Sequence, residues 1–344
     1  MKSRQNVNLG TRLLLCLFLM AFTLFIYMFQ DVLLPKNFFT DAGTITNLIN
    51  YIDLGSAQSD SFVSTAWVFN SLGYEGSQLF LLAGVMSVVW LMSFRSRSYD
   101  LVAFTILYML PFTLFNLKLS KEAIVIIMNV SCCLVCMSHR SKIFKVAVVT
   151  VLYLLYAYYF RFYYAFIAAG MVFLTCLFSS TGRMRIALIC LAIVVCIALP
   201  GDIWTQLQLA RDSVNTSREG LSDSKTIFSN LLTPDGFITA IPNSLYAAVR
   251  FLFAPAFSLR PQELLLSIVL WSAIILMVRN KNYSHPLMAL LMANFLIQTF
   301  FEPDLGSFLR HMTAYAFCLY AVPLAKKNIS TVNHRAISNS LRAS

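Results

Sequence analysis

The sequence has few charged residues. Asp, Glu, Lys and Arg together make up only 12% of its 344 positions, whereas 58% are hydrophobic. The mean hydropathy of +0.71 lies far above that of water-soluble domains. This scarcity of charge excludes an ordinary soluble enzyme, which could not keep so much apolar surface away from water. The composition therefore indicates an integral membrane protein.

The sequence also lacks the motifs of cofactor chemistry. It contains no zinc ligand set, nucleophile elbow, dinucleotide fingerprint or Walker loop. Cys133 and Cys136 form a C-x-x-C, but no second ligand pair lies nearby, and all eight cysteines fall inside apolar segments. Such cysteines usually pack in a core. We therefore expect no metal and no cofactor, and no ATP-driven transport by this chain alone.

Apolar runs of about 20 residues, the length that crosses a bilayer as a helix, recur along the whole chain. They predict an all-α polytopic membrane protein, with residues 1–344 forming a single integral membrane domain. We predict ten transmembrane helices, at about residues 12–33, 77–93, 99–117, 122–138, 143–160, 163–179, 186–200, 261–279, 286–301 and 312–325.

The distribution of charge predicts the orientation, because basic residues of short loops stay in the cytoplasm. With the N-terminus inside, fourteen of the fifteen acidic residues fall on the outer side and only Asp100 lies inside. Sixteen of the 26 basic residues fall inside: Lys2, Arg4, Arg12, Arg95, Arg97, Arg140, Lys142, Lys145, Arg183, Arg185, Arg279, Lys281, Lys326, Lys327, Arg335 and Arg342. Both termini are therefore expected in the cytoplasm, with 326–344 as a basic tail. The net charge of +11 then follows from topology and implies no nucleic-acid partner.

Two outer segments are too long for simple turns. Residues 34–76 contain FFTDAGTITNLINYIDL and FVSTAWVFNSLG, each amphipathic enough to form a short interfacial helix. Residues 201–260 form the large outer loop between helices 7 and 8. Its end, YAAVRFLFAPAFSLRP, is bounded by Pro242 and Pro255 and is predicted to be re-entrant or interfacial, with a full crossing as the alternative.

Five outer cations lie against apolar neighbours. LKLSKEAI (117–124) places two lysines and a glutamate between two predicted spans, and YYFRFYYAF (158–166) sets one arginine among aromatic rings. A charge at bilayer depth costs about 2.5–3.5 kcal/mol even on the lenient insertion scale. A guanidinium matches phosphate oxygens in bidentate fashion, so such a set suits a diphosphate. The candidate diphosphate ligands are Lys118, Lys121, Arg161, Arg250 and Arg310.

Structural roles compete with this interpretation. Arg161 could equally anchor a helix end at the interface, within an aromatic belt of Tyr158, Tyr159, Tyr163 and Tyr164. Lys118 and Glu122 are four residues apart and could pair along one helix. Lys121 would then remain without a local partner.

Outer carboxylates are candidates for deprotonating a hydroxyl nucleophile. Those close to the membrane are Asp41, Glu122, Glu302 and Asp304, and His311 is the only outer histidine. An ordinary interfacial role is the more common one for such a histidine.

The layout resembles the O-antigen and capsular polysaccharide polymerases of the Wzy type. The likeness covers most of the chain and rests on the ten spans with both ends inside, the enlarged late outer loop, the LKLSKEAI turn, RFYYAFIAAG, and IPNSLYAAVRFLFAPAFSLRPQELLLSIV. Some family members carry an arginine eleven residues before a glycine in two outer loops. This sequence departs from that pattern. The residue eleven positions after Arg161 is Val172, and the residue eleven positions after Arg211 is Ser222, so neither is a glycine.

The resemblance implies a glycan transfer on the outer face of the bacterial inner membrane. A growing glycan would leave one undecaprenyl diphosphate carrier and join a sugar hydroxyl of another lipid-linked repeat unit. The five cations would hold the diphosphate, and Glu122 or Asp41 would orient or deprotonate the acceptor. Tyr163, Tyr164, Trp204 and Trp67 could stack on sugar rings. Partners would be the lipid-linked oligosaccharide, membrane lipid and, where the host has one, a chain-length regulator.

Other functions compete with polymerisation. Another polyprenyl-phosphate-dependent glycosyltransferase would suit the acid Asp41 in the first outer loop. An O-antigen ligase would be favoured by a histidine in the long outer loop, and residues 201–260 contain none. A flippase for lipid-linked oligosaccharides would be expected to show charges deep in its spans and internal repeats. A structural membrane protein would tolerate leucine in place of Arg161, Arg250 or Arg310.

Overall fold

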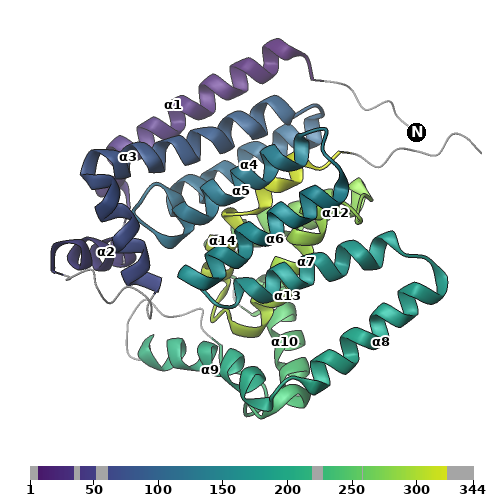
Figure 1. Ribbon diagram of the computed structural model, residues 1–344. Coiled ribbons are helices and arrows are strands. Elements are labelled where there is room, and N and C mark those ends of the chain that lie inside the picture. The colour runs from purple at the N-terminus through teal and green to yellow at the C-terminus, as the bar shows by residue number, and fades with distance from the viewer. Residues whose placement is uncertain (1–6, 35–38, 52–60, 219–227, 258, 324–344) are drawn as a thin grey trace, which may run out of the picture.

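The computed structural model describes residues 7–34, 39–51, 61–218, 228–257 and 259–323 (Figure 1). Every regular element in these residues is a helix. The α-helices are α1 (Leu9–Leu33), α2 (Thr40–Tyr51), α3 (Ser61–Arg95), α4 (Tyr99–Asn116), α5 (Lys121–Met137), α6 (Lys142–Tyr159), α7 (Tyr164–Ser179), α8 (Gly182–Ala198), α9 (Gly201–Arg218), α10 (Gly236–Leu252), α11 (Ala254–Phe257), α12 (Pro261–Asn280), α13 (Pro286–Phe301) and α14 (Leu305–Thr313), followed by the 3-10 helix η3 (Ala316–Ala321).

All predicted spans except the last coincide with a helix. Among the described residues, five helices are long and apolar enough to cross a membrane: α1, α3, α4, α6 and most of α12. A sixth candidate span arises if α8 and α9, which meet at 82°, form one broken crossing. The chain is therefore a helical protein with the apolar helices of a membrane protein. The count of ten crossings and the orientation stay predictions.

The predicted span 312–325 is wrong as a continuous α-helix. α14 begins at Leu305, ends at Thr313, and continues after a turn as η3. A helix break inside an apolar bundle frees backbone carbonyl groups that must find donors. Here the Tyr108 hydroxyl donates to the Thr313 carbonyl, and the Asn129 amide donates to the Ala314 carbonyl at 2.9 Å. These hydrogen bonds from α4 and α5 satisfy the two carbonyl groups that the helix break leaves without a partner in the helix.

The two predicted outer segments contain the expected helices. α2 covers the first amphipathic stretch, and the second forms the start of α3, which kinks at Gly73. Gly73 adopts a φ of 69°, a conformation that favours glycine. In the long loop, α9 and α10 account for most residues, and α10 runs through Pro242 instead of beginning after it. The prediction that Pro242 bounds this segment is wrong: the helix continues through it, although a proline inside a helix removes one backbone hydrogen bond and crowds the preceding turn.

The centre of the bundle is α13, which packs against α7, α9 and α10. Gly170 of α7 allows a close approach, since a Cβ atom there would lie 3.2 Å from the Cβ of Ala293. By contrast, α8 has no buried residue and exposes Ile186, Val194 and Ile197. Such a face suits lipid.

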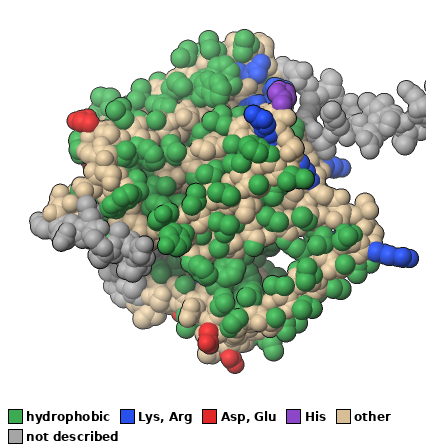
Figure 2. Space-filling view, in the orientation of Figure 1, with side chains coloured by type: hydrophobic (Ala, Val, Ile, Leu, Met, Phe, Trp, Pro, Cys, Tyr) green, Lys and Arg blue, Asp and Glu red, His purple; other side chains and the backbone are tan. Residues whose placement is uncertain are grey.

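Charge separates between the two ends of the molecule. Figure 2 shows Lys and Arg side chains mainly on the side where the N-terminus lies in Figure 1, and Asp and Glu side chains on the opposite and lower sides. Hydrophobic side chains cover the surface between them. The predicted basic tail 326–344, together with Lys2 and Arg4, lies outside the described residues.

Candidate functional site

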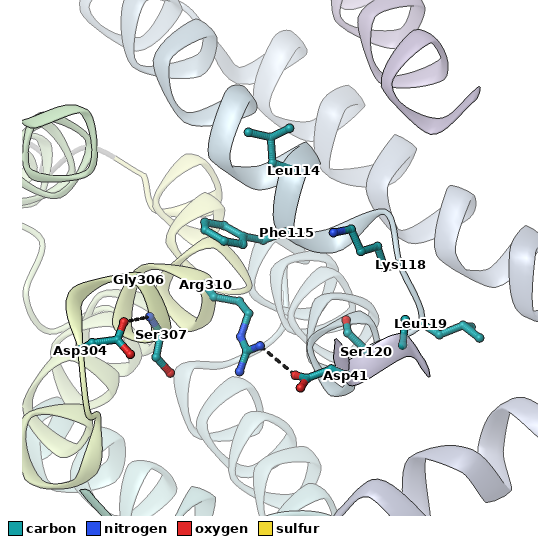
Figure 3. A pocket seen from close by; sticks show the side chains of 11 residues that line it. Asp41, Leu114, Phe115, Lys118, Leu119, Ser120, Asp304, Gly306, Ser307 and Arg310 are labelled. Carbon is teal, nitrogen blue, oxygen red and sulfur yellow. Dashed lines mark hydrogen bonds and ion pairs between the residues drawn. The ribbon is translucent and has the colours of Figure 1, made fainter. Parts of the chain in front are cut away.

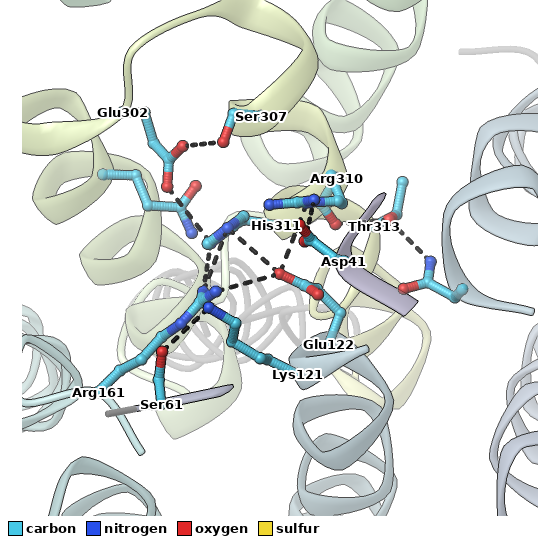
Figure 4. A network of polar contacts seen from close by, with 12 residues as sticks. Asp41, Ser61, Lys121, Glu122, Arg161, Glu302, Ser307, Arg310, His311 and Thr313 are labelled. Carbon is cyan, nitrogen blue, oxygen red and sulfur yellow. Dashed lines mark hydrogen bonds and ion pairs between the residues drawn. The ribbon is translucent and has the colours of Figure 1, made fainter. Parts of the chain in front are cut away.

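Most of the candidate site residues meet at one end of the bundle. They come from α2, the turn between α4 and α5, the start of α5, the turn between α6 and α7, the end of α13, and α14 (Figure 4). The segments are far apart in the sequence. Their convergence is the feature of the structure that composition could not predict.

The start of α5 places two charges at this end. Ser120 has an extended backbone and precedes the helix, so Lys121 and Glu122 fall in its first turn. A carboxylate in a first turn interacts favourably with the helix dipole. Because Lys118 precedes the helix, it does not pair with Glu122 along one helix face. Lys118 instead lies over the Phe39 ring, with 4.0 Å from its Nζ to the ring centroid.

α14 presents three polar side chains toward the site. Its N-cap is Asp304, whose carboxylate accepts a hydrogen bond of 2.8 Å from the Ser307 backbone N–H. Ser307, Arg310 and His311 then follow at spacings of three and four residues, so they share one helix face. That spacing was available in the sequence. Ser307 nevertheless escaped the sequence analysis.

Glu122 is the hub of the ionic contacts (Figure 4). Its Oε1 lies 3.5 Å from Arg161, 3.6 Å from Arg310 and 3.4 Å from His311. Glu122 is buried, and its Oε2 has no hydrogen-bond partner among the described residues. A buried carboxylate held by two guanidinium groups is a poor base, because their charges stabilise its ionised form. The contacts suit a residue that positions cations.

Arg161 is therefore not a simple interfacial anchor. Its guanidinium turns inward, where it contacts Glu122 and donates to the Tyr163 hydroxyl at 2.9 Å. The side chain is 11% exposed. Of the predicted aromatic belt, Tyr158 and Tyr159 are exposed, whereas Tyr163 and Tyr164 belong to the interior.

His311 lies between two carboxyl groups. Its Nε2 is 3.4 Å from Glu122, and its Nδ1 is 3.3 Å from Glu302. Glu302 also accepts a hydrogen bond of 2.6 Å from the Ser307 hydroxyl. Burial raises the pKa of Glu302 to about 7, although the Ser307 hydrogen bond and the nearby Arg161 and Arg310 oppose this shift. Ser307, Glu302 and His311 thus form a chain of groups able to hold or pass a proton.

An open pocket of about 280 Å³ lies beside this network (Figure 3). Its charged lining residues are Lys118, Arg310, Asp41 and Asp304, and Ser120 and Ser307 add hydroxyl groups. Arg310 forms an ion pair of 2.8 Å with Asp41 across it. Ser307 belongs both to the pocket wall and to the Glu302 chain, so it connects the two.

No family model, curated protein or solved structure matches this chain. Function must therefore be inferred from the side chains of the site. The pocket offers both cations and carboxylates, which suits a ligand that carries phosphate oxygens as well as hydroxyl groups. Sugar phosphates have that combination.

Lys121 is buried behind the pocket wall. Its Nζ donates to the Ser61 hydroxyl at 3.0 Å and lies 3.1 Å from the centroid of the Phe62 ring. The hydroxyl and the aromatic face are the partners that the sequence did not reveal. Lys121 thus belongs to the charged cluster without lining the pocket, as do Arg161 and Glu122.

The remaining predicted residues do not join this cluster. The Arg250 guanidinium lies over the rings of Phe228 and Phe257, 5.1 and 4.3 Å from their centroids. Tyr164 packs between Tyr153 and Tyr156, and Trp204 packs between Phe237 and Phe300. Because both rings are buried by aromatic neighbours, the prediction that they stack on sugars is not supported.

Tyr163 and Trp67 differ from those two. The Tyr163 ring packs on Phe301, with 4.1 Å between centroids, and its hydroxyl serves Arg161. A positioning role for Tyr163 thus fits better than sugar stacking. Trp67, on the first part of α3, is 48% exposed and keeps a free surface.

The structural role of Arg211 was not predicted from the sequence. Its side chain is completely buried, and it donates to the carbonyl groups of Thr299 and Glu302 and to the Asn230 side chain. These bonds satisfy carbonyl groups at the end of α13. Arg211 therefore fixes the backbone that carries Glu302.

Proposed function

We propose that this protein is a membrane glycosyltransferase of the polysaccharide polymerase kind. It would transfer a glycan from an undecaprenyl diphosphate carrier to a hydroxyl of a second lipid-linked repeat unit, on the outer face of the bacterial inner membrane. The observation that carries the proposal is the convergence of Lys118, Lys121, Arg161 and Arg310 at one end of an apolar bundle. An open polar pocket beside them contains Asp41.

The proposed reaction is a substitution at the anomeric carbon. The acceptor oxygen forms a bond to that carbon, and the bond between the carbon and the diphosphate oxygen breaks. Its electron pair stays on the diphosphate, and the acceptor proton goes to a carboxylate. The chemical demand is stabilisation of the growing charge on the leaving group, which fixed cations supply efficiently.

Arg310 and Lys118 are the cations that would contact the diphosphate, because they line the pocket. An arriving diphosphate competes with Asp41 for the Arg310 guanidinium. Displaced from Arg310, the Asp41 carboxylate becomes free to accept the proton of the acceptor hydroxyl. Arg161 and Lys121 would add positive potential from behind the wall, and Glu122 would keep the two arginines in position.

A second candidate is another carrier-dependent glycosyltransferase, including an O-antigen ligase. The favouring observation is that His311 belongs to the charged cluster although the long outer loop has no histidine. A flippase is less well supported, since Arg161, Arg310 and His311 all contact Glu122 in a single cluster at one end of the bundle.

Deletion of the gene, with surface polysaccharide separated by gel electrophoresis, distinguishes these candidates. The polymerase proposal expects a single repeat unit on the lipid and loss of the ladder of longer chains. Complete loss of surface glycan would favour a ligase or a flippase. An unchanged ladder would refute a role in glycan assembly, and re-expression of the wild-type gene provides the control.

A further inference from the structure

A second pocket lies at the end of the bundle opposite to the candidate site. It has a volume of about 400 Å³ and lies where α3 ends, α4 begins, α12 ends and η3 ends. The 18 residues of α4 separate the two pockets by about 27 Å at 1.5 Å per residue. The charge distribution predicts this end to be cytoplasmic.

Three arginines line this pocket, against one carboxylate. The arginines are Arg95, Arg97 and Arg279, and the carboxylate is Asp100. Arg279 forms an exposed ion pair of 2.8 Å with Asp100. The Arg95 guanidinium contacts the Met137 sulfur, a weak acceptor, and the Arg97 guanidinium makes no ion pair or hydrogen bond with any described residue. The pocket thus has a net positive charge, and it has guanidinium N–H groups that can donate hydrogen bonds to a ligand.

The other wall of the pocket is apolar. Leu101, Leu276, Leu319 and Val322 form it. Val278, next to the pocket on α12, and Tyr99, at the start of α4, are exposed, as expected at a membrane interface. A ligand that fills the pocket needs a negatively charged group and an apolar part.

Asn280 adds a hydrogen-bond acceptor. Its side chain is buried, its amide nitrogen donates to the Val322 carbonyl at 3.5 Å, and its Oδ1 has no partner among the described residues. This oxygen can accept a hydrogen bond from a hydroxyl group of a ligand.

We propose that this pocket binds an anionic glycerophospholipid of the adjacent leaflet. The phosphate would lie between Arg97 and Arg279, a head-group hydroxyl would reach Asn280, and an acyl chain would follow the apolar wall. Basic pockets between helices at this depth are typical sites of anionic lipid. The proposal concerns lipid binding alone and does not depend on glycan transfer.

The test uses the purified full-length protein and native mass spectrometry with phosphatidylglycerol or phosphatidylcholine. The double variant Arg97→Gln/Arg279→Gln should lose affinity for phosphatidylglycerol by about 30-fold, the effect of two cations at about 1 kcal/mol each. Its affinity for phosphatidylcholine should stay unchanged. The control is Arg140→Gln/Arg183→Gln, which removes the same charge from exposed positions outside the pocket.

Three outcomes would overturn the proposal. The first is an unchanged affinity for phosphatidylglycerol in the pocket variant, and the second is an equal loss in the control, which would indicate general surface attraction. The third is displacement of bound phosphatidylglycerol by millimolar inorganic phosphate, which would indicate a site for soluble anions. A folded pocket variant is verified by an unchanged thermal midpoint in detergent without added lipid.

Discussion

Arg310 and Asp41, which are 269 residues apart in the sequence, form an ion pair of 2.8 Å across the pocket of the candidate site. The pair connects α14 to α2, and in it the charge of Asp41 neutralises that of Arg310 within the pocket. Each side chain keeps more than a quarter of its surface exposed, so a ligand can reach both. An anionic ligand that binds the Nη1 group of Arg310 must replace Asp41, which couples such binding to release of a carboxylate.

Arg310→Gln should reduce polymer formation by about 100-fold or more, because a fixed donor to the leaving group is lost. Arg250→Gln is the matched control: Arg250 also lies in the last turn of its helix, but it contacts aromatic rings. The measurement is the ladder of chain lengths on a gel, with protein level determined by immunoblot. Equal loss of long chains in both variants would show that polymer formation does not depend on Arg310 as a pocket residue.

Asp41→Asn should separate binding from transfer. Without the competing carboxylate, Arg310 is free, so the affinity for undecaprenyl diphosphate should rise. The transfer rate should fall by about 10²–10⁴-fold, the usual contribution of a general base. Binding is measured with the purified protein, and transfer with lipid-linked repeat units. A variant that loses both the affinity for undecaprenyl diphosphate and the transfer rate would assign Asp41 to the structure of the pocket alone.

The helical positions could largely be predicted from the sequence. Apolar runs of span length determine where α1, α4 and α6 lie, because a helix is the structure that satisfies its own backbone in lipid. The last span could not be predicted, since its break at Ala314 depends on donors from Tyr108 and Asn129 on other helices.

The candidate site could be predicted only in part. The unusual setting of Lys118, Arg161 and Arg310 among apolar residues marked them as candidates, and the structure brings these three residues to one end of the bundle. The setting of Arg250 has the same pattern, yet tertiary packing directs it to Phe228 and Phe257. Burial of Tyr164 and Trp204 likewise depends on neighbours from distant segments, which a single sequence does not reveal.

Lys118 should make diphosphate binding sensitive to pH. Burial lowers its pKa to about 8, with nearby Asp31 and Asp41 opposing the shift. The lysine is charged below that pH and becomes neutral above it, so affinity for undecaprenyl diphosphate should fall between pH 7 and 9. Lys118→Arg should remove this dependence, because arginine stays charged. Identical pH profiles for the two proteins would exclude Lys118 as the titrating group.

Arg161 and Glu122 should show strong energetic coupling. Removing one partner of a buried ion pair costs about 3–5 kcal/mol, because the other charge stays buried. Arg161→Met and Glu122→Gln should each lower the unfolding midpoint in detergent, and the double variant should lose less than the sum of both. The coupling free energy expected for contacting residues is about 0.5–3 kcal/mol. Strict additivity would show that the contact of 3.5 Å contributes nothing.

Glu302 should make the stability of the protein depend on pH in a defined window. Its pKa is raised from 4.5 to about 7, mainly by burial. A carboxyl group with a raised pKa contributes stability that is complete below about pH 4.5 and is lost as pH rises through about 7. Glu302→Gln, which keeps the shape and the neutral charge state, should remove that loss, so the difference in unfolding midpoint between variant and wild type should grow from pH 5 to pH 8.

Asp304→Asn serves as the control, since Asp304 is also buried but caps α14 through its carboxylate. If the midpoints of wild type and Glu302→Gln change in parallel over this range, Glu302 is ionised throughout, and the proton chain through His311 would need another donor.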